Sequence, residues 1–187
     1  HVIDWLKESK ADVLCLQETK CVDAKFPKDE FQQLGYECFF FGQKTYNGVA
    51  IISRFPIQST LSNFPDIPKP EQTRFVKAEI ETVTVLNAYI PNGSEPGSEK
   101  FEYKMEWLAK LNDYIRNSFD KDQKVLLCGD FNIAPEDRDV YDPEKTRGQI
   151  LVSDDERGAL QKIRDWGFVD AFRMHEEEAG HFTWWDY

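Results

Sequence analysis

Two carboxylates follow apolar segments of the chain at positions where they could bind a metal ion. Glu18 lies two residues beyond the apolar run 13–16, and Asp130 lies two residues beyond the run 125–128, across Gly129. Segments just beyond a strand are exposed, while the strand fixes their position. Mg²⁺ binds one or two carboxylates, with water and substrate phosphate as its other ligands. Glu18 and Asp130 are therefore candidate magnesium ligands.

The second carboxylate belongs to the motif Gly129-Asp130-Phe131-Asn132. Residues two apart in extended backbone face the same way, so we expect Asp130 and Asn132 to point into one cleft, with Phe131 packed behind them. A carboxylate beside an amide can orient a water molecule, as general-base hydrolysis near a metal requires. Taken alone, a Gly-Asp pair after a strand also fits an ordinary turn.

A third motif, Tyr89-Ile90-Pro91-Asn92-Gly93, follows another apolar run. Its proline and glycine predict a sharp loop at the end of a strand. The Tyr89 phenol and the Asn92 amide could donate hydrogen bonds to a phosphate. A tyrosine packed in the core before a turn is the alternative interpretation.

Both strands and helices are predicted to position these residues. Strands are predicted at 13–16, 36–41, 49–52, 75–80, 83–90, 125–128, 168–172 and 181–185. Helical spacing of apolar residues predicts a start helix near residues 2–6 and a helix of about five turns over 101–119. A further helix begins at the capping pair Ser153 and Glu156. This mixture predicts an α/β or α+β domain with one largely antiparallel sheet.

Length and composition limit the classes of protein. A chain of 187 residues with 41% hydrophobic side chains fits one domain with a sizeable core. The sequence has no apolar run of membrane-spanning length, no signal-peptide pattern, and no Cys-x-x-Cys pair that would indicate a zinc ribbon. We therefore expect a reduced, intracellular and cytoplasmic protein that is not secreted, does not bind membranes and is monomeric.

The net charge of -11 argues against a general coat for nucleic acid. The charge is uneven, however, because residues 42–93 carry 5 basic and 4 acidic side chains. Acidity therefore does not exclude DNA. Any such binding should be local and metal-assisted.

Together these motifs resemble the exonuclease III family of abasic-site DNA endonucleases, within the endonuclease/exonuclease/phosphatase superfamily. The matching stretches occur in the family's order: LCLQETK at 14–20, YNGVAIISR at 46–54, YIPNG at 89–93, GDFNIAPED at 129–137 and TWWDY at 183–187. The segment 133–142 and the Trp-Trp-Asp-Tyr end are the parts most specific to this branch.

The resemblance implies a four-layer α/β sandwich, in which two mixed, mostly antiparallel sheets pack face to face with helices outside. It also implies roles for individual residues. Metal binding falls to Glu18, Asp130 and Asn132, and catalysis to Tyr89, Asp130 and Asn132. Substrate contacts fall to Asn92 and to Trp184, which would wall the pocket for the base-free sugar. Tyr46 and Arg74 are further expected DNA contacts.

The implied activity is Mg²⁺-dependent hydrolysis of the DNA backbone 5′ to an abasic site, with trimming of 3′ ends and Mn²⁺ as a possible substitute metal. The expected substrate is double-stranded DNA with abasic sites or blocked 3′ ends. If the protein is bacterial, we expect it to act on DNA of the nucleoid. An abasic nucleotide lacks stacking and pairing, so extruding it costs less than flipping an intact one.

Two family features are not found in this sequence. A metal-site asparagine on a first strand would precede His1, and an aspartate and a histidine on later strands would follow Tyr187. We therefore expect residues 1–187 to be one domain that lacks those strands and has little activity on its own. Two alternatives remain open: another superfamily hydrolase acting on inositol phosphates, sphingomyelin or RNA, and a non-catalytic DNA-binding protein with this fold.

Overall fold

A computed structural model describes residues 2–183. The chain divides into two compact units, residues up to 89 together with 122–130, and residues 90–121 together with those from 131 on. The chain therefore passes from the first unit to the second directly after Tyr89 and again directly after Asp130.

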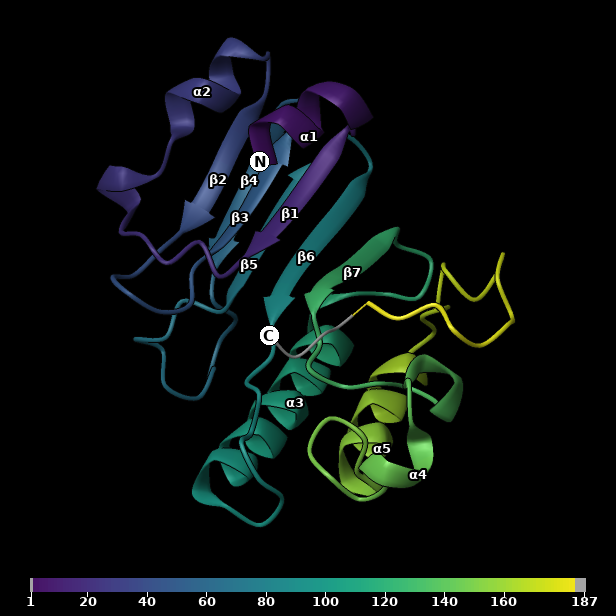
Figure 1. The fold of residues 1–187 in the computed structure, drawn as a ribbon. Coiled ribbons are helices and arrows are strands. Elements are labelled where there is room, and N and C mark those ends of the chain that lie inside the picture. The colour runs from purple at the N-terminus through teal and green to yellow at the C-terminus, as the bar shows by residue number, and fades with distance from the viewer. Residues whose placement is uncertain (1, 184–187) are drawn as a thin grey trace. The chain divides into compact units, whose positions relative to one another are not determined.

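The first unit contains a three-stranded antiparallel sheet of order β1-β3-β2. Its elements are α1 (Val2–Ser9), β1 (Val13–Gln17), the 3₁₀ turn η1 (Asp23–Lys25), α2 (Lys28–Gln33), β2 (Glu37–Phe41) and β3 (Val49–Ser53). Both helices cover one face of this sheet (Figure 1). Leu6 of α1 and Phe31 of α2 pack there with Ala50 and Ile52 of β3.

The other sheet of this unit has four strands in the order β4-β5-β6-β7. They are β4 (Ile57–Ser62), β5 (Phe75–Ile80), β6 (Val83–Tyr89) and β7 (Val125–Asp130). β4, β5 and β6 pair antiparallel, whereas β6 and β7 are parallel. This mixed pairing agrees with the predicted sheet type.

The two sheets face each other across a shared apolar layer. Val49 and Ile51 of β3 pack with Val76 and Ala78 of β5, and all four side chains are buried. Because successive side chains of a strand alternate in direction, β3 contributes residues 49 and 51 to this layer and residues 50 and 52 to the helix-covered face. Burial on both faces explains the unbroken apolar run in β3.

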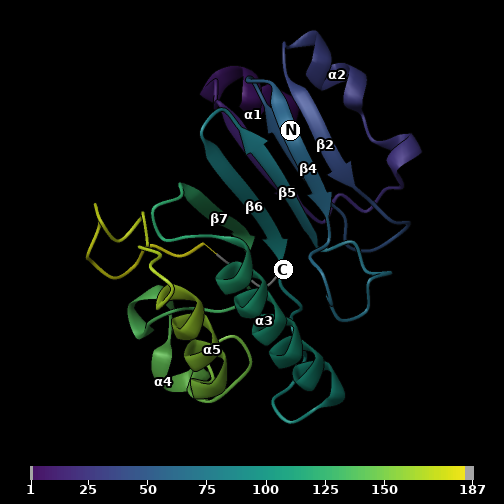
Figure 2. The same cartoon turned by 180° about the vertical axis from the view of Figure 1, so that it is seen from behind.

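The second unit is helical in its regular structure. Its elements are α3 (Glu99–Ser118), the 3₁₀ turn η2 (Asp137–Asp139), α4 (Pro143–Thr146) and α5 (Asp154–Arg164). Helices α3 and α5 lie side by side in both views of the ribbon (Figure 2). The buried side of α3 includes Phe101, Leu108 and Leu111. The Ser153–Glu156 capping box begins α5 as predicted.

The fold class and the hairpin β5–β6 are confirmed, but other sequence predictions are wrong. Residues 168–172 form no strand, because the Asp170 carboxylate accepts hydrogen bonds from the N–H groups of Phe172 and Arg173 and turns the backbone. Residues 181–183 are not in a strand either, and 184–185 lie outside the described residues. β4 was not predicted. β1 and β7 are only partly buried, with Leu126 46% exposed.

Among residues 2–183, each helix is too short or too polar to cross a membrane.

Candidate functional site

Glu18 extends from the end of β1 into a hydrogen-bonded pair with Tyr89, which ends β6. The Tyr89 hydroxyl donates to Glu18 Oε1, and Lys20 Nζ lies 2.7 Å from Glu18 Oε2. Glu18 has a φ of 55°, a left-handed conformation that residues other than glycine rarely adopt. Unfavourable backbone geometry of this kind is common at functional sites, where the surrounding structure holds it in place.

Asp130 is brought next to Tyr89 by strand pairing. Tyr89 and Asp130 are the last register partners of the parallel strands β6 and β7. Gly129 makes this pairing possible, since a Cβ atom there would lie 1.9 Å from the Ala88 carbonyl oxygen. The first unit thus brings Glu18, Tyr89 and Asp130 together at the ends of three strands, as the sequence predicts for Glu18 and Asp130.

Arg74 packs directly on the Tyr89 ring. Its guanidinium carbon lies 4.7 Å from the ring centroid, and Nη1 donates to the Tyr89 carbonyl oxygen at 3.3 Å. The Tyr89 N–H in turn donates to the Arg74 carbonyl oxygen at 2.7 Å. Arg74 therefore holds the tyrosine by stacking as well as by hydrogen bonds, and it places a positive charge near the Glu18 carboxylate.

The electrostatics of this group keep the carboxylate charged and the phenol neutral. Hydrogen bonds from Lys20 and then from Tyr89 hold the pKa of Glu18 below its ordinary value of 4.5. Burial, followed by the hydrogen bond to Glu18, raises the pKa of Tyr89 well above its ordinary value of 10.0. At neutral pH Tyr89 is therefore a hydrogen-bond donor and Glu18 an ionised acceptor.

The loop that carries Glu18 is supported by the segment 46–48. The N–H groups of Thr19 and Lys20 donate to the carbonyl oxygens of Gly48 and Asn47, at 3.2 and 2.9 Å. A Cβ atom on Gly48 would lie 2.1 Å from Thr19 Oγ1, so only glycine allows this close approach. Tyr46 itself is 69% exposed, and its predicted DNA contact stays a prediction.

The second unit contains the two predicted asparagines, which contact each other. Asn92 Nδ2 donates to Asn132 Oδ1 at 3.2 Å, and Asn132 Nδ2 donates to the Ile90 carbonyl oxygen at 2.9 Å. Asn132 is 7% exposed, whereas Asn92 is exposed. The structure therefore joins two motifs that are 40 residues apart in sequence.

The reason given from sequence for a shared direction of Asp130 and Asn132 is wrong. β7 ends at Asp130, and Asn132 has a φ of 48°, so the backbone is not extended through both residues. The alternation rule consequently does not apply to Asn132, whose direction is set by its hydrogen bonds. Trp184 lies outside the described residues, and its predicted role stays a prediction.

The carboxylates suit a hard divalent cation. Glu18 and Asp130 offer acceptor oxygens and no soft ligand, which is the donor chemistry that Mg²⁺ prefers. Lys20 already pairs one Glu18 oxygen with a positive charge, as a bound cation would. In the part of the chain that the structure describes, no group of three or more His, Cys, Asp or Glu side chains could enclose a metal. A site here would therefore rely on water and substrate oxygens for its other ligands.

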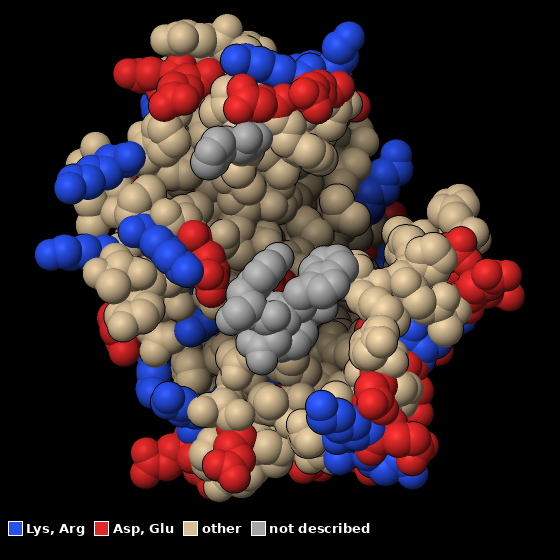
Figure 3. Space-filling view, in the orientation of Figure 1, with Lys and Arg blue, Asp and Glu red and all other residues tan. Residues whose placement is uncertain are grey.

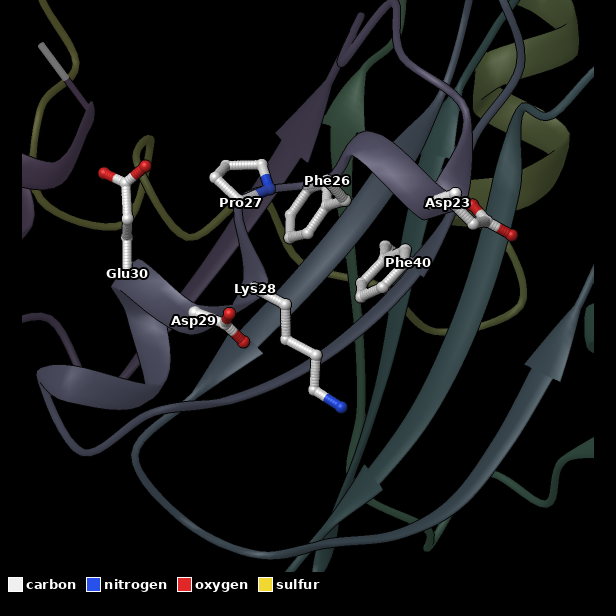
Figure 4. A pocket seen from close by; sticks show the side chains of 8 residues that line it. Asp23, Phe26, Pro27, Lys28, Asp29, Glu30 and Phe40 are labelled. Atoms are coloured by element: carbon white, nitrogen blue, oxygen red, sulfur yellow. The ribbon is translucent and has the colours of Figure 1, made fainter.

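A separate pocket lies elsewhere in the first unit, around the stacked rings of Phe26 and Phe40 (Figure 4). Its volume is about 420 Å³. It is lined by Asp23, Ala24, Phe26, Pro27, Lys28, Asp29, Glu30 and Phe40. None of the predicted site residues is among them.

Acidic and basic side chains are interspersed over the face drawn in Figure 3, so the charge of -11 is not concentrated in one block there.

Sequence reasoning missed two polar residues that support the site, Asn87 and Lys104, and recognised Glu156 only as a helix cap. Asn87, fully buried in β6, joins the two sheets by donating to the carbonyl oxygens of Leu16 and Ala50 and accepting from Gln17 Nε2. Lys104 and Glu156 form a buried ion pair in the second unit. A signal existed for Asn87 and Lys104, because each is a polar residue at a position where the periodic pattern predicts an apolar one.

Comparison with known proteins gives a consistent match over the chain. The model of the Endonuclease/Exonuclease/phosphatase family matches residues 1–187. An exodeoxyribonuclease of Bacillus subtilis is 33% identical over 189 residues, which cover 99% of this chain and 73% of that protein.

Two solved structures match with a TM-score of 0.95 each. One is an AP endonuclease from Archaeoglobus fulgidus, 40% identical, with 100% of this chain and 72% of that chain covered. The other is the 3′ phosphatase NExo from Neisseria bound to a product DNA hairpin, 41% identical with the same coverage.

Proposed function

This chain belongs to the endonuclease/exonuclease/phosphatase family, in the branch of exodeoxyribonucleases III and AP endonucleases, and we propose that it is a Mg²⁺-dependent DNA repair phosphodiesterase. It cuts the backbone 5′ to abasic sites and trims 3′ ends. The observation that carries the proposal is the convergence of Glu18, Tyr89 and Asp130 at the ends of three strands, with Arg74 stacked on the tyrosine.

The first unit supplies most of the reaction chemistry. Asp130 orients a water molecule and accepts its proton as the water attacks phosphorus in line with the 3′ oxygen that leaves. Tyr89 stays protonated and donates a hydrogen bond to a phosphate oxygen, exchanging its present acceptor on Glu18 for the substrate. Arg74 keeps the ring in place and offers positive charge to the substrate phosphate.

The second unit supplies amide donors. Asn92 is exposed and binds a substrate phosphate, while the Asn132 amide orients a water molecule. Donors that are fixed before the reaction stabilise charge that develops on phosphate oxygens in the transition state.

Glu18, Asp130 and Asn132 are the residues that would hold Mg²⁺. When bound, this ion supplies neutralisation of the negative charge that builds on the phosphate. Glu18 is suited to this role because it remains ionised well into the acidic range. Lys20, which pairs with Glu18 in this structure, would have to give up that contact for Glu18 to hold the ion.

The decisive experiment is incubation of the full-length protein and Mg²⁺ with a duplex that carries one abasic site. We expect a single nick on the 5′ side of that site, no nick in the intact duplex, and no reaction in excess chelator. Release of phosphate from inositol or sphingomyelin substrates without a nick would instead favour another hydrolase of this family. Binding to abasic DNA without any cleavage would favour a non-catalytic protein.

A 3′-end activity is the second candidate, favoured by the similarity to the Neisseria 3′ phosphatase. The same catalytic group can hydrolyse a phosphate monoester at a 3′ end. A nicked duplex ending in a 3′-phosphate, placed in the same assay, measures this activity beside incision. Equal loss of both activities on removal of Tyr89 is expected if one site performs both.

A further inference from the structure

Lys104 is a fully buried lysine on α3 whose ammonium contacts the backbone of both asparagine motifs. Nζ donates to the carbonyl oxygen of Asn92 at 3.0 Å and to that of Asn132 at 2.6 Å. Its third donor goes to Glu156 Oε1. The ammonium of one side chain therefore hydrogen-bonds to the backbone of two loops that are distant in sequence.

Both members of the ion pair are hydrogen-bonded to their surroundings. The ammonium donates to the three acceptors just named. Glu156 also accepts at Oε1 from the Leu151 N–H at 3.1 Å, and at Oε2 from the N–H and hydroxyl of Ser153 at 3.1 and 2.6 Å. Both side chains are 0% exposed. The pair thus belongs to the rigid interior that connects α3 with the start of α5.

The surrounding backbone is shaped around the lysine. A Cβ atom on Gly93, which has a φ of 92°, would lie 2.9 Å from Lys104 Cδ, so this glycine leaves room for the lysine stem. Asn132 is held in a left-handed conformation while Lys104 binds its carbonyl oxygen. The ammonium therefore anchors the backbone of a residue in the left-handed region, a conformation that asparagine adopts more readily than most residues.

Stability alone is a weak reason for such a pair, because removing two charges from water costs about as much as their attraction returns. Fixing the directions of neighbouring side chains is a better explanation for a buried ion pair at this position. With both carbonyl groups held by one ammonium, the side-chain amides of Asn92 and Asn132 meet at 3.2 Å in one arrangement. We propose that Lys104 is a positioning residue that sets the directions of the Asn92 and Asn132 amides for phosphate and water.

This inference rests on the proposed function for its catalytic consequence, but its structural part can be tested separately. The variant K104M/E156Q removes both charges and so avoids leaving a lone buried carboxylate. We expect it to fold, and we expect kcat on abasic DNA, corrected for the folded fraction, to fall about 10- to 100-fold through misplacement of the amides. The control K100M removes an exposed lysine next to the start of the same helix and should leave kcat unchanged.

The spectroscopic arm uses the side-chain amide resonances of the asparagines. In folded K104M/E156Q those of Asn92 and Asn132 should shift, while those of Asn112 and Asn117 on the same helix should not. Unshifted Asn92 and Asn132 resonances, or unchanged kcat, would overturn the inference. If the wild-type protein does not cut abasic DNA, the proposed function fails and the resonances alone decide.

A measurement on the wild-type protein covers the case in which the double variant does not fold. Correlations through hydrogen bonds should connect Lys104 Nζ to the carbonyl carbons of Asn92 and Asn132, with the ammonium protons protected from exchange. Fast-exchanging ammonium protons without these correlations would contradict the proposal.

Discussion

Tyr89 ends β6 and Glu18 directly follows β1, two strands of different sheets, and the tyrosine hydroxyl donates a hydrogen bond to the glutamate. The two sheets pack on each other through apolar side chains, which fixes their separation without specifying any chemistry. The bond between Tyr89 and Glu18 places a neutral donor and an ionised acceptor at one edge of that core. A phosphate with a cation could use both groups.

Replacing Tyr89 with phenylalanine should lower the single-turnover rate on abasic duplex by about 10²–10³, the usual cost of losing one fixed donor to developing charge. The ring and its contact with Arg74 remain, so folding should be retained. Tyr141→Phe is the matched control, because that hydroxyl is on a side chain that is 87% exposed. Equal rates for Tyr89→Phe and wild type would remove Tyr89 from the catalytic group.

The titration of Glu18 provides a test that needs no substrate. Because its folded-state pKa lies below the ordinary value of 4.5, ionised Glu18 contributes stability that is fully present above that pH and is lost as the pH falls through the folded pKa. Lys20→Met should raise this pKa more than Tyr89→Phe, since Lys20 is the larger cause. Carbon-detected NMR of the carboxyl group measures both shifts, and the reverse order would show that Tyr89 dominates.

Asp130→Asn should abolish most cleavage while leaving DNA binding intact. General-base assistance contributes about 10²–10⁴ to a rate, and an amide cannot accept the proton from water. Single-turnover cleavage and fluorescence anisotropy with the same abasic duplex separate the two effects. A proportional loss of affinity would indicate instead that Asp130 acts mainly in substrate binding and not as the general base.

The part of the site that could be predicted from sequence is the part placed by strand ends. Glu18, Tyr89 and Asp130 each follow or end an apolar run, and a run of this kind ends where the sheet edge is reached. Their mutual contact depends on sheet register, which follows from pairs such as Tyr89 with Asp130 that no local pattern specifies.

The parts that could not be predicted depend on backbone shape and on buried polar groups. Asn132 leaves the extended conformation directly after β7, which alternation cannot anticipate. The predicted strand at 168–172 is a turn, because the Asp170 side chain offers the backbone a closer acceptor than a neighbouring strand would. Lys104 occupies an apolar position of α3 only because Glu156 and two carbonyl groups receive it.

Asn87 should be essential for the stability of the first unit. Asn87→Leu keeps the branched shape of the side chain and removes three hydrogen bonds between the two sheets, so we expect a loss of about 3 kcal/mol at about 1 kcal/mol for each bond. Urea unfolding measures the change. Asn117→Leu, at an exposed position of α3, should change stability little. A loss of similar size in both variants would mean that the bonds of Asn87 contribute nothing particular.

Gly129→Ala should separate the effect of strand pairing from that of side-chain chemistry. The new methyl group would meet the Ala88 carbonyl oxygen at 1.9 Å, and the backbone φ of 134° is unfavourable for alanine. We expect the last residue pairs of the β6–β7 ladder to shift, with a stability loss of about 1–3 kcal/mol from backbone strain. Cleavage should fall as well, although Tyr89 and Asp130 are both retained, because their register pairing is disturbed.

Gly158→Ala on α5 is the control, and its expected effect on stability is the opposite. Nothing lies within 4 Å of its added Cβ atom, so this helix should be stabilised by about 0.5–1 kcal/mol. A Gly129→Ala protein with wild-type stability and cleavage would mean that the pairing of β6 with β7 does not position the catalytic group.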